Sequence, residues 1–325
     1  MSAILVVRPS SLGDVVHALA LVADVRRHRP EFAIDWVAEE AFAGIVALDP
    51  DVRRVIPVAL RRWRHSPLAP ATWHEMTEFR RALRRDEYAA VLDLQEQVKG
   101  ALIARTARGV RHGPDRKSIR EPVATLAHDV HHRIDPAQHL IDRCRRLAGA
   151  ALGYDADGPP RFRFDVPPPG ASLALPGRPY VVALHATSRA SKLWPESHWS
   201  ELLTGLAHAG FATVLPWGNA TEHARSDRIA AETPAATVPP RVPLEALAAL
   251  LARAELVIGV DTGLVHLAAA LGTPTVALFV ATDPALAGVT RTGAHARDLG
   301  GVGETPTVAA AREAASALLR AAPRC

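Results

Sequence analysis

The chain has 325 residues, of which 48% are hydrophobic and 22% charged, a balance typical of a globular protein large enough for two domains. No run of about 18 or more apolar residues occurs, which excludes a membrane-spanning helix. The two cysteines, Cys144 and Cys325, give neither a disulfide framework nor a metal-ligand spacing.

Positive charge is concentrated in the first half of the chain. Residues 1–165 carry 26 Lys and Arg against 22 Asp and Glu, whereas the remainder carries 12 of each. Because nearly all of these basic residues are arginine, whose planar fork suits carboxylates and phosphates, we expect any acidic partner to bind the first half. The amino terminus has no basic leader or cleavage site, so a cytoplasmic location is expected.

The first half alternates strands and helices. Apolar runs predict strands at residues 3–7, 34–37, 55–58 and 89–94, and helices at 15–28, 42–48, 73–83, 98–105 and 137–152. Two strongly basic segments, Arg61–His65 and Asp115–Arg120, are expected as loops. The proline-rich segment 159–179 predicts a semi-rigid linker.

The same alternation resumes after the linker. Strands are expected at 180–184, 212–215, 256–259 and 275–279, and helices at 195–207, 222–231, 243–252, 264–271 and 307–321. This pattern predicts an α/β protein with two Rossmann-like, doubly wound domains facing a cleft. The expected limits are 1–158 for the first domain and 180–325 for the second, whose closing helix is free to pack back on the first.

The turn Asp261-Thr262-Gly263 is the strongest candidate for a binding site. It follows an apolar strand and opens a helix, so it lies at the carboxyl edge of a parallel sheet, with free N–H groups that suit a phosphate. The alternative is an ordinary helix cap. Thr187, Ser188 and Lys192 follow the first strand of the second domain and also fit phosphate binding, although Lys192 is equally consistent with a surface lysine.

Two further side chains follow the next strand. Glu222 is suited to ribose hydroxyls and Trp217 to the face of a base. A helix-dipole role for Glu222 and core packing for Trp217 remain open.

Several motifs, taken together, resemble the heptosyltransferases of bacterial lipopolysaccharide core synthesis. They are Ser10-Ser11-Leu12-Gly13-Asp14-Val15-Val16-His17, Arg61-Arg62-Trp63-Arg64, Thr187-Ser188 with Lys192-Leu193-Trp194-Pro195, Leu215-Pro216-Trp217-Gly218 and Val260-Asp261-Thr262-Gly263-Leu264-Val265-His266-Leu267. The Arg-Arg-Trp-Arg segment, with His112-Gly113 and Arg120-Glu121-Pro122, is most similar to the branch of the family that adds the first heptose to Kdo on lipid A (heptosyltransferase I).

The resemblance implies an inverting GT-B glycosyltransferase that uses ADP-L-glycero-β-D-manno-heptose and needs no metal or cofactor. It assigns Asp14 as the general base. On physical grounds, Lys192 and a helix N-terminus are expected to stabilise the charge that develops on the leaving phosphate. Implied donor contacts are Thr187, Ser188, Lys192, Trp217, Glu222, Asp261, Thr262, Gly263 and His266. Implied contacts to the Kdo-lipid A acceptor are Ser10, Arg61, Arg62, Arg64 and Arg120. His65, Ala186 and Ser188 depart from the family pattern.

The acceptor's acyl chains imply a peripheral enzyme on the inner face of the cytoplasmic membrane. Two other functions stay open: a heptosyltransferase II-like enzyme, and a nucleotide-sugar-binding protein without turnover, which would not need Asp14. Nucleic-acid binding is disfavoured because aromatic residues are few. The two Asp-x-Asp segments, Asp49–Asp51 and Asp155–Asp157, are interpreted as turns and not as metal ligands.

Overall fold

The computed structural model describes residues 2–170, 173–293 and 295–321 and divides into two compact units, Met1–Asp165 and Val166–Cys325. Cys144 is a buried free thiol, while Cys325 lies outside the described residues. The limits 1–158, 159–179 and 180–325 expected from the sequence stay a prediction.

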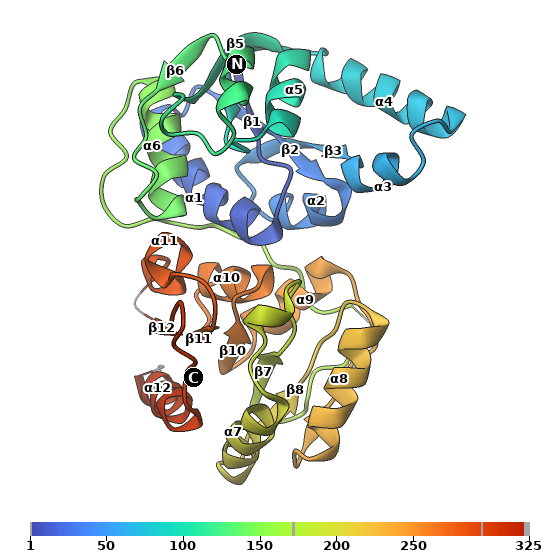
Figure 1. Cartoon of the computed structure of the whole chain (residues 1–325), viewed down its shortest axis with the longest axis vertical. Helices are drawn as coiled ribbons and strands as arrows, with labels where there is room; N and C mark the ends of the chain where they lie inside the picture. Colours follow the sequence, from blue (N-terminus) through green and yellow to red (C-terminus); the bar gives the residue numbers. More distant parts are fainter. Residues whose placement is uncertain (1, 171–172, 294, 322–325) are drawn as a thin grey trace. The chain divides into compact units, whose positions relative to one another are not determined.

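The first unit contains one six-stranded parallel sheet in the order β3-β2-β1-β4-β5-β6. The elements of this unit are coloured blue to green in Figure 1. Its strands are β1 (Ala3–Val7), β2 (Ala33–Glu39), β3 (Val52–Val58), β4 (Glu87–Asp93), β5 (Arg108–Pro114) and β6 (Val130–His132). Its helices are α1 (Leu12–His28), α2 (Glu40–Val46), α3 (Leu60–His65), α4 (Pro70–Leu83), α5 (Val98–Thr106), the 3-10 turn η1 (Pro122–Ala127) and α6 (Leu140–Leu152).

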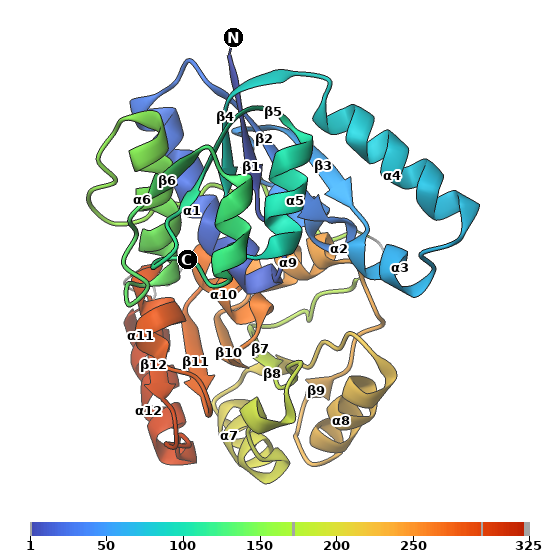
Figure 2. The same ribbon diagram turned by 45° about the horizontal axis from the view of Figure 1, so that its top comes forward.

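The central strand β1 explains why this sheet forms. All five of its residues are buried, as expected for a parallel strand covered on both faces. Leu83 of α4 and Ile103 of α5 pack with Leu5 and Val91 on one face, and α1 packs against α6. Figure 2 shows α3 and α4 beside β3, at one lateral end of the sheet.

The second unit repeats this topology, with the parallel order β12-β11-β10-β7-β8-β9. Its strands are β7 (Tyr180–Leu184), β8 (Ala212–Val214), β9 (Ala236–Thr237), β10 (Leu256–Val260), β11 (Thr275–Phe279) and β12 (Ala296–Gly300). Its helices are η2 (Ala190–Lys192), α7 (Glu196–His208), α8 (Ala220–Ala231), α9 (Leu244–Ala252), α10 (Gly263–Ala270), α11 (Pro284–Ala287), η3 (Val289–Arg291) and α12 (Val308–Ala321).

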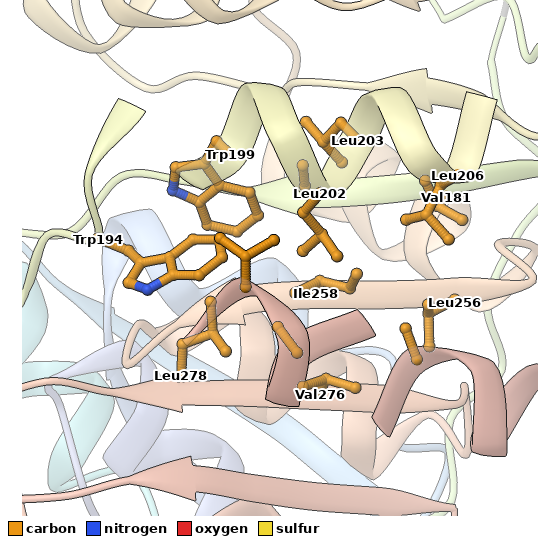
Figure 3. Packing of buried hydrophobic residues seen from close by; sticks show 14 of the residues in the cluster. Val181, Trp194, Trp199, Leu202, Leu203, Leu206, Leu256, Ile258, Val276 and Leu278 are labelled. Atoms are coloured by element: carbon orange, nitrogen blue, oxygen red, sulfur yellow. The ribbon is translucent and has the colours of Figure 1, made fainter. Parts of the chain in front are cut away.

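One face of this second sheet carries a core built around two tryptophans (Figure 3). Trp194 and Trp199 are fully buried and meet edge to face with their ring centroids 5.2 Å apart. The Trp194 Nε1–H donates to the Pro306 carbonyl at 2.8 Å, so its one polar atom is satisfied. This anchor fixes the chain immediately after Lys192.

The α/β fold with two doubly wound units is therefore confirmed, but several local predictions were incomplete. The segment Arg61–His65, expected as a loop, lies in the helix α3 (Leu60–His65), none of whose residues is buried. Strands β5, β6, β9 and β12 were missed because they lie toward the lateral ends of their sheets and lack a continuous apolar run. Helix α12, left free to pack back on the first domain, contributes its buried side to the core of the second unit.

The described part of segment 153–179 contains no helix or strand, and its first portion is bound to the first unit. Arg145 pairs with Asp24 at 2.7 Å and donates to the Gly158 carbonyl at 2.9 Å. Further along, the Asp165 N–H donates to the Leu48 carbonyl at 2.8 Å. The chain is thus tied to this unit up to residue 165.

Candidate functional site

Each sheet has one topological switch point, where successive strands begin to add on the opposite side. It lies between β1 and β4 in the first unit and between β7 and β10 in the second. Loops that leave the carboxyl ends of such strand pairs form the usual ligand crevice of a doubly wound sheet. Most of the candidate residues follow one of these four strands.

In the first unit the carboxylate of Asp14 is held on both oxygens. Oδ2 accepts from the Ser11 backbone N–H and from the Ser11 hydroxyl, each at 2.8 Å. Oδ1 lies 3.3 Å from Nη2 of Arg8, a residue that is only 4% exposed. Burial, the largest single influence, would lower the pKa of Arg8, but the nearby acidic groups, Asp14 first and then Cys144, Glu96 and Asp93, together outweigh it and keep the pKa above its usual value. Asp14 therefore has a permanent positive neighbour.

Contacts across the first switch point position Ser10. Its N–H donates to Gln95 Oε1 at 3.1 Å, and its hydroxyl accepts from Lys99 Nζ at 2.8 Å. Arg8 also donates to the Leu94 carbonyl, so the loops after β1 and β4 are joined at three points. Ser10 is thus fixed between the helix that carries Asp14 and the start of α5.

Lys99 is a site residue that sequence reasoning missed. Burial is the main cause of its lowered pKa, which also responds to the charges of Asp14, Arg8, Glu39 and Arg61. Its ammonium group contacts the Ser10 hydroxyl, which places Lys99 in the neighbourhood of Asp14.

The arginines of α3 differ in how far they are already paired. Arg62 is held by Glu40 at 2.9 Å and by Glu75 at 2.7 Å, and these hydrogen bonds raise its pKa. The guanidinium of Arg61 lies over the Phe42 ring, 5.1 Å from its centroid. Arg64 forms no ion pair with any described residue, so it keeps its full charge for a ligand.

Arg120 is brought toward the switch point by its neighbour in the chain. The Glu121 N–H donates to the Glu96 carbonyl at 3.1 Å, and the Glu121 carboxylate accepts from the Val98 N–H at 2.8 Å. Arg120 itself is exposed. No contact within the described residues joins Arg62, Arg64 or Arg120 directly to Asp14.

In the second unit Asp261 is the centre of the candidate site. Its carboxylate lies 2.5 Å from Lys192 Nζ, 2.7 Å from the Thr282 hydroxyl and 3.3 Å from His266 Nε2. Its backbone carbonyl accepts from the Thr187 hydroxyl at 3.0 Å. These contacts bridge the second switch point, from the loop after β7 to the turn after β10.

Electrostatics keep Asp261 ionised. Burial would raise its pKa, but hydrogen bonds from His266, Lys192 and Thr282 and the charge of His266 outweigh burial and hold the pKa well below its usual range. Thr262 is the N-cap residue of α10 and Gly263 its first residue, so free backbone N–H groups adjoin this cluster. The arrangement offers cationic and N–H donors to an anion.

Ser188, a predicted donor contact, is exposed and has no hydrogen bond in the described part of the chain. Thr282, which donates to Asp261, is a second site residue that was not predicted from the sequence. Thr282 follows β11, the strand next to β10. The position of Thr282 just after a predicted strand could have marked it as a candidate, but only if the order of the strands in the sheet had been known.

Trp217 and Glu222 form a second group after β8. Glu222 accepts from the Gly218 N–H and from the Asn219 side chain, both at 2.7 Å, so it caps the start of α8. The Trp217 Nε1–H donates to the Pro239 carbonyl at 2.9 Å, and its ring centroid lies 4.3 Å from that of His223. A helix-capping role for Glu222 is thus present whether or not it also binds a ligand.

The two Asp-x-Asp segments lie outside both switch points. Asp49 precedes β3 at the amino edge of the first sheet, where its carboxylate accepts from the Asp51 N–H at 3.0 Å. Burial raises the pKa of Asp49 to about 6. Among the described residues, no group of three or more His, Cys, Asp or Glu side chains is arranged to hold a metal ion. Within residues 2–170, 173–293 and 295–321, no helix is long and apolar enough to cross a bilayer.

Comparison with known proteins gives consistent matches. The family model described as glycosyltransferase family 9 (heptosyltransferase) matches residues 76–312. Lipopolysaccharide heptosyltransferase 1 of Salmonella typhimurium is 42% identical over 289 residues, covering 88% of this chain and 90% of the relative.

Two solved structures match over almost the whole chain. The E. coli heptosyltransferase WaaC with ADP has a TM-score of 0.88 and 37% identity, covering 98% of this chain and 100% of that one. WaaC with ADP-2-deoxy-2-fluoro heptose has a TM-score of 0.83 and 38% identity, covering 96% and 98%.

Proposed function

Because the chain belongs to glycosyltransferase family 9, the heptosyltransferases, we propose that its second unit binds the sugar donor and its first unit the acceptor. The enzyme is a GT-B glycosyltransferase that transfers heptose from ADP-heptose in lipopolysaccharide core synthesis. We further propose that the acceptor is Kdo of Kdo-lipid A.

The observation that carries the proposal is the Lys192–Asp261–His266 cluster beside the start of α10. Lys192 and the free N–H groups at Thr262 and Gly263 bind the diphosphate of the donor. Thr187 and Thr282 orient Asp261, while Ser188, Trp217 and Glu222 complete the contacts to the nucleotide. A helix N-terminus and a lysine are both suited to phosphate oxygens.

Heptosyl transfer then follows with inversion. Asp14 takes the proton of the acceptor hydroxyl as its oxygen attacks the anomeric carbon. The bond from that carbon to the β-phosphate oxygen breaks, and ADP leaves with the electron pair. Lys192 and the α10 N-terminus stabilise the charge that develops on the phosphate, so the chain's own groups supply the electrostatic stabilisation.

The first unit supplies the acceptor contacts. Arg61, Arg64 and Arg120, with a weaker contribution from the paired Arg62, bind the carboxylates of Kdo, and Ser10 orients the sugar beside Asp14.

Peripheral attachment to the inner face of the cytoplasmic membrane follows from the acyl chains of the acceptor. It is supported by two apolar side chains near α3, Leu68 at 87% exposed and Trp73 at 59% exposed. Basic residues beside exposed apolar ones favour an anionic bilayer surface.

ADP release from purified enzyme and ADP-heptose tests this function, with Kdo-lipid A or heptosyl-Kdo-lipid A as the acceptor. We expect release with Kdo-lipid A and little with the heptosylated lipid. Preferential use of the heptosylated lipid would replace the proposed acceptor with that of a heptosyltransferase II. ADP-heptose binding without release on either acceptor would indicate a binding protein.

A further inference from the structure

A basic pocket lies beyond the switch point of the first unit, at the β6 end of its sheet. Strands β5 and β6 end at Pro114 and His132, so the loops that follow them leave from the same carboxyl edge as the loop before Asp14. With α6 these loops line an open pocket with a volume of about 690 Å³. It is lined by Lys117, Ser118, Arg133, Ile134, Asp135, Pro136, Gln138, Arg146 and Ala150.

Hydrogen bonds hold the two loops together. Ser118 is 4% exposed; its hydroxyl donates to Asp115 Oδ1 at 2.7 Å and accepts from the Ile134 N–H at 3.0 Å. The Lys117 N–H also donates to Asp115 Oδ1, at 3.0 Å. Lys117 and Arg133 are the chain neighbours of this Ser118–Ile134 link, so their backbones are fixed before any ligand arrives.

The positive charge of the pocket is only partly compensated by carboxylates in its lining. Lys117, Arg133 and Arg146 form no side-chain hydrogen bond or ion pair with any described residue, and the one carboxylate in the lining, Asp135, accepts from the Ala137 N–H at 3.0 Å. Asp115, just outside the lining, has a lowered pKa, chiefly through its hydrogen bond from Ser118 and to a smaller extent through the charge of Arg133. The lining residues alone carry an excess of two positive charges.

An uncharged group in the pocket, the side-chain amide of Gln138, further restricts the class of ligand that fits. The Oε1 atom of Gln138 is buried and has no hydrogen-bond partner within the described part of the chain. An unpaired buried acceptor is costly and is satisfied by a hydroxyl or N–H donor. Cationic side chains and an amide oxygen in the lining of one pocket thus match an anionic group attached to a hydroxylated scaffold.

We propose that this pocket binds a phosphomonoester carried on a sugar, and that in the reaction proposed above this group belongs to the lipid anchor of the acceptor. A phosphomonoester carries about 1.5 to 2 negative charges at neutral pH, which matches the excess in the lining. Guanidinium forks bind its oxygens in pairs. The pocket would then hold the anchor while the acceptor sugar lies at the switch point. This inference rests on the proposed acceptor.

The test compares two double variants that each remove two positive charges. Arg133→Ala with Arg146→Ala alters the pocket, and Arg105→Ala with Arg108→Ala is the matched control at the amino edge of the same sheet. All four side chains are exposed and none forms an ion pair within the described residues, so neither variant loses buried contacts. Thermal unfolding checks that both remain folded.

Binding is measured without donor, by co-sedimentation with phosphatidylcholine vesicles that contain Kdo-lipid A or its dephosphorylated form. We expect the pocket variant to bind the phosphorylated vesicles roughly 10- to 100-fold more weakly than the wild type, as two charge-assisted contacts are lost. The control variant should bind like the wild type. On dephosphorylated vesicles all three proteins should bind equally.

Three results would overturn the inference. Equal weakening of both variants would mean unspecific attraction of surface charge. Undiminished binding of the wild type to dephosphorylated vesicles would exclude phosphate recognition. The same pocket effect on vesicles containing phosphatidylglycerol, a diester, would assign the pocket to anionic lipids in general. Because no turnover is measured, failure of the proposed function, seen as no ADP release by the wild type, remains a separate outcome.

Discussion

Asp14→Asn is the substitution that separates catalysis from helix capping, and the structure sets the size of both effects. The carboxylate serves three donors, two from Ser11 and one from Arg8. An asparagine has one oxygen, so either its amide group faces the buried Arg8 guanidinium or it faces the Ser11 donors. The substitution is therefore not neutral for the fold, even though asparagine is a good capping residue.

The expected loss of stability is modest. A lost cap costs about 1 kcal/mol, and a buried donor left without its partner costs about 1–3 kcal/mol. The Ser11 donors are exposed, so an asparagine that keeps its oxygen toward the buried Arg8 loses only contacts that water replaces, and the lower end of that range applies. A protein with a typical stability of about 5–15 kcal/mol stays folded after this loss. General-base loss, by contrast, lowers kcat by about 10²- to 10⁴-fold.

The assay is ADP release at saturating donor and acceptor, with the folded fraction measured in parallel by urea unfolding. Ser11→Ala is the matched control because it removes one donor to Asp14 and leaves the carboxylate in place. We expect Ser11→Ala to lose stability but keep turnover within a few-fold of the wild type. A folded Asp14→Asn enzyme with near-normal kcat would refute the base assignment.

Three further predictions concern the donor site, the acceptor site and pH. Lys192→Ala should weaken ADP binding roughly 10- to 100-fold, because a charge-assisted contact is lost and the Asp261 carboxylate is left facing the diphosphate. In an Asp261→Asn background the same substitution should weaken ADP binding less, as measured by calorimetry. Equal losses in both backgrounds would contradict this coupling. Arg64→Ala should raise the acceptor KM more than Arg62→Ala, whose guanidinium is already paired, with the Kd of ADP unchanged in both; the reverse order would show that pairing does not limit Arg62. The pKa of Asp49, raised to about 6 from 3.8, means that the folded state holds a proton that the unfolded state releases, so this stabilisation is complete below about pH 4 and is lost as the pH rises through 6. Asp49→Asn should therefore raise the free energy of unfolding by up to about 3 kcal/mol at pH 7.5 and leave it unchanged at pH 4; equal effects at both pH values in urea titrations would rule this out.

Local patterns were sufficient to predict the second-unit turn. An apolar run, the sequence Asp261-Thr262-Gly263 and an alanine-rich stretch specify a strand, a turn and a helix within about twenty residues. The structure places Lys192 on Asp261 at 2.5 Å, a pairing that the sequence left open. This contact depends on the strand order. Because β7 and β10 are adjacent in the sheet, the loop after β7 that carries Lys192 lies beside the turn after β10 that carries Asp261.

Lys99 shows what local reasoning lacks. Its partner Ser10 is 89 positions away in the chain, and nothing near Lys99 marks it as more than a surface lysine at the start of α5. Once two doubly wound sheets are expected, however, the strand order predicts that the first and fourth strands are adjacent. Residues after the strand predicted at 89–94 were therefore available as candidates.

The helix α3 was missed for a different physical reason. Its six residues, Leu-Arg-Arg-Trp-Arg-His, are too few to show an apolar period: Leu60 and Trp63 are only partly buried against the core, and none of its residues is fully buried. Contacts from outside the segment stabilise it: Glu39 accepts from the Arg61 N–H at 3.0 Å, and Glu75 accepts from both Arg62 and Trp63 at 2.7 Å. Such carboxylates, more than ten residues away, cannot be assigned from a periodicity.

The hydrogen bonds that tie the chain to the first unit up to residue 165 leave residues 166–179 as the covalent connection to the first strand of the second sheet, and Leu173 within this segment is buried. A segment of that length spans at most about 50 Å when fully extended. Short tethers of this kind keep each unit at an effective concentration in the millimolar range as seen by the other. Because both units belong to one chain, the encounter of a ligand held by one unit with the other unit does not depend on the protein concentration. Specific activity should therefore stay constant when the enzyme is diluted in the assay.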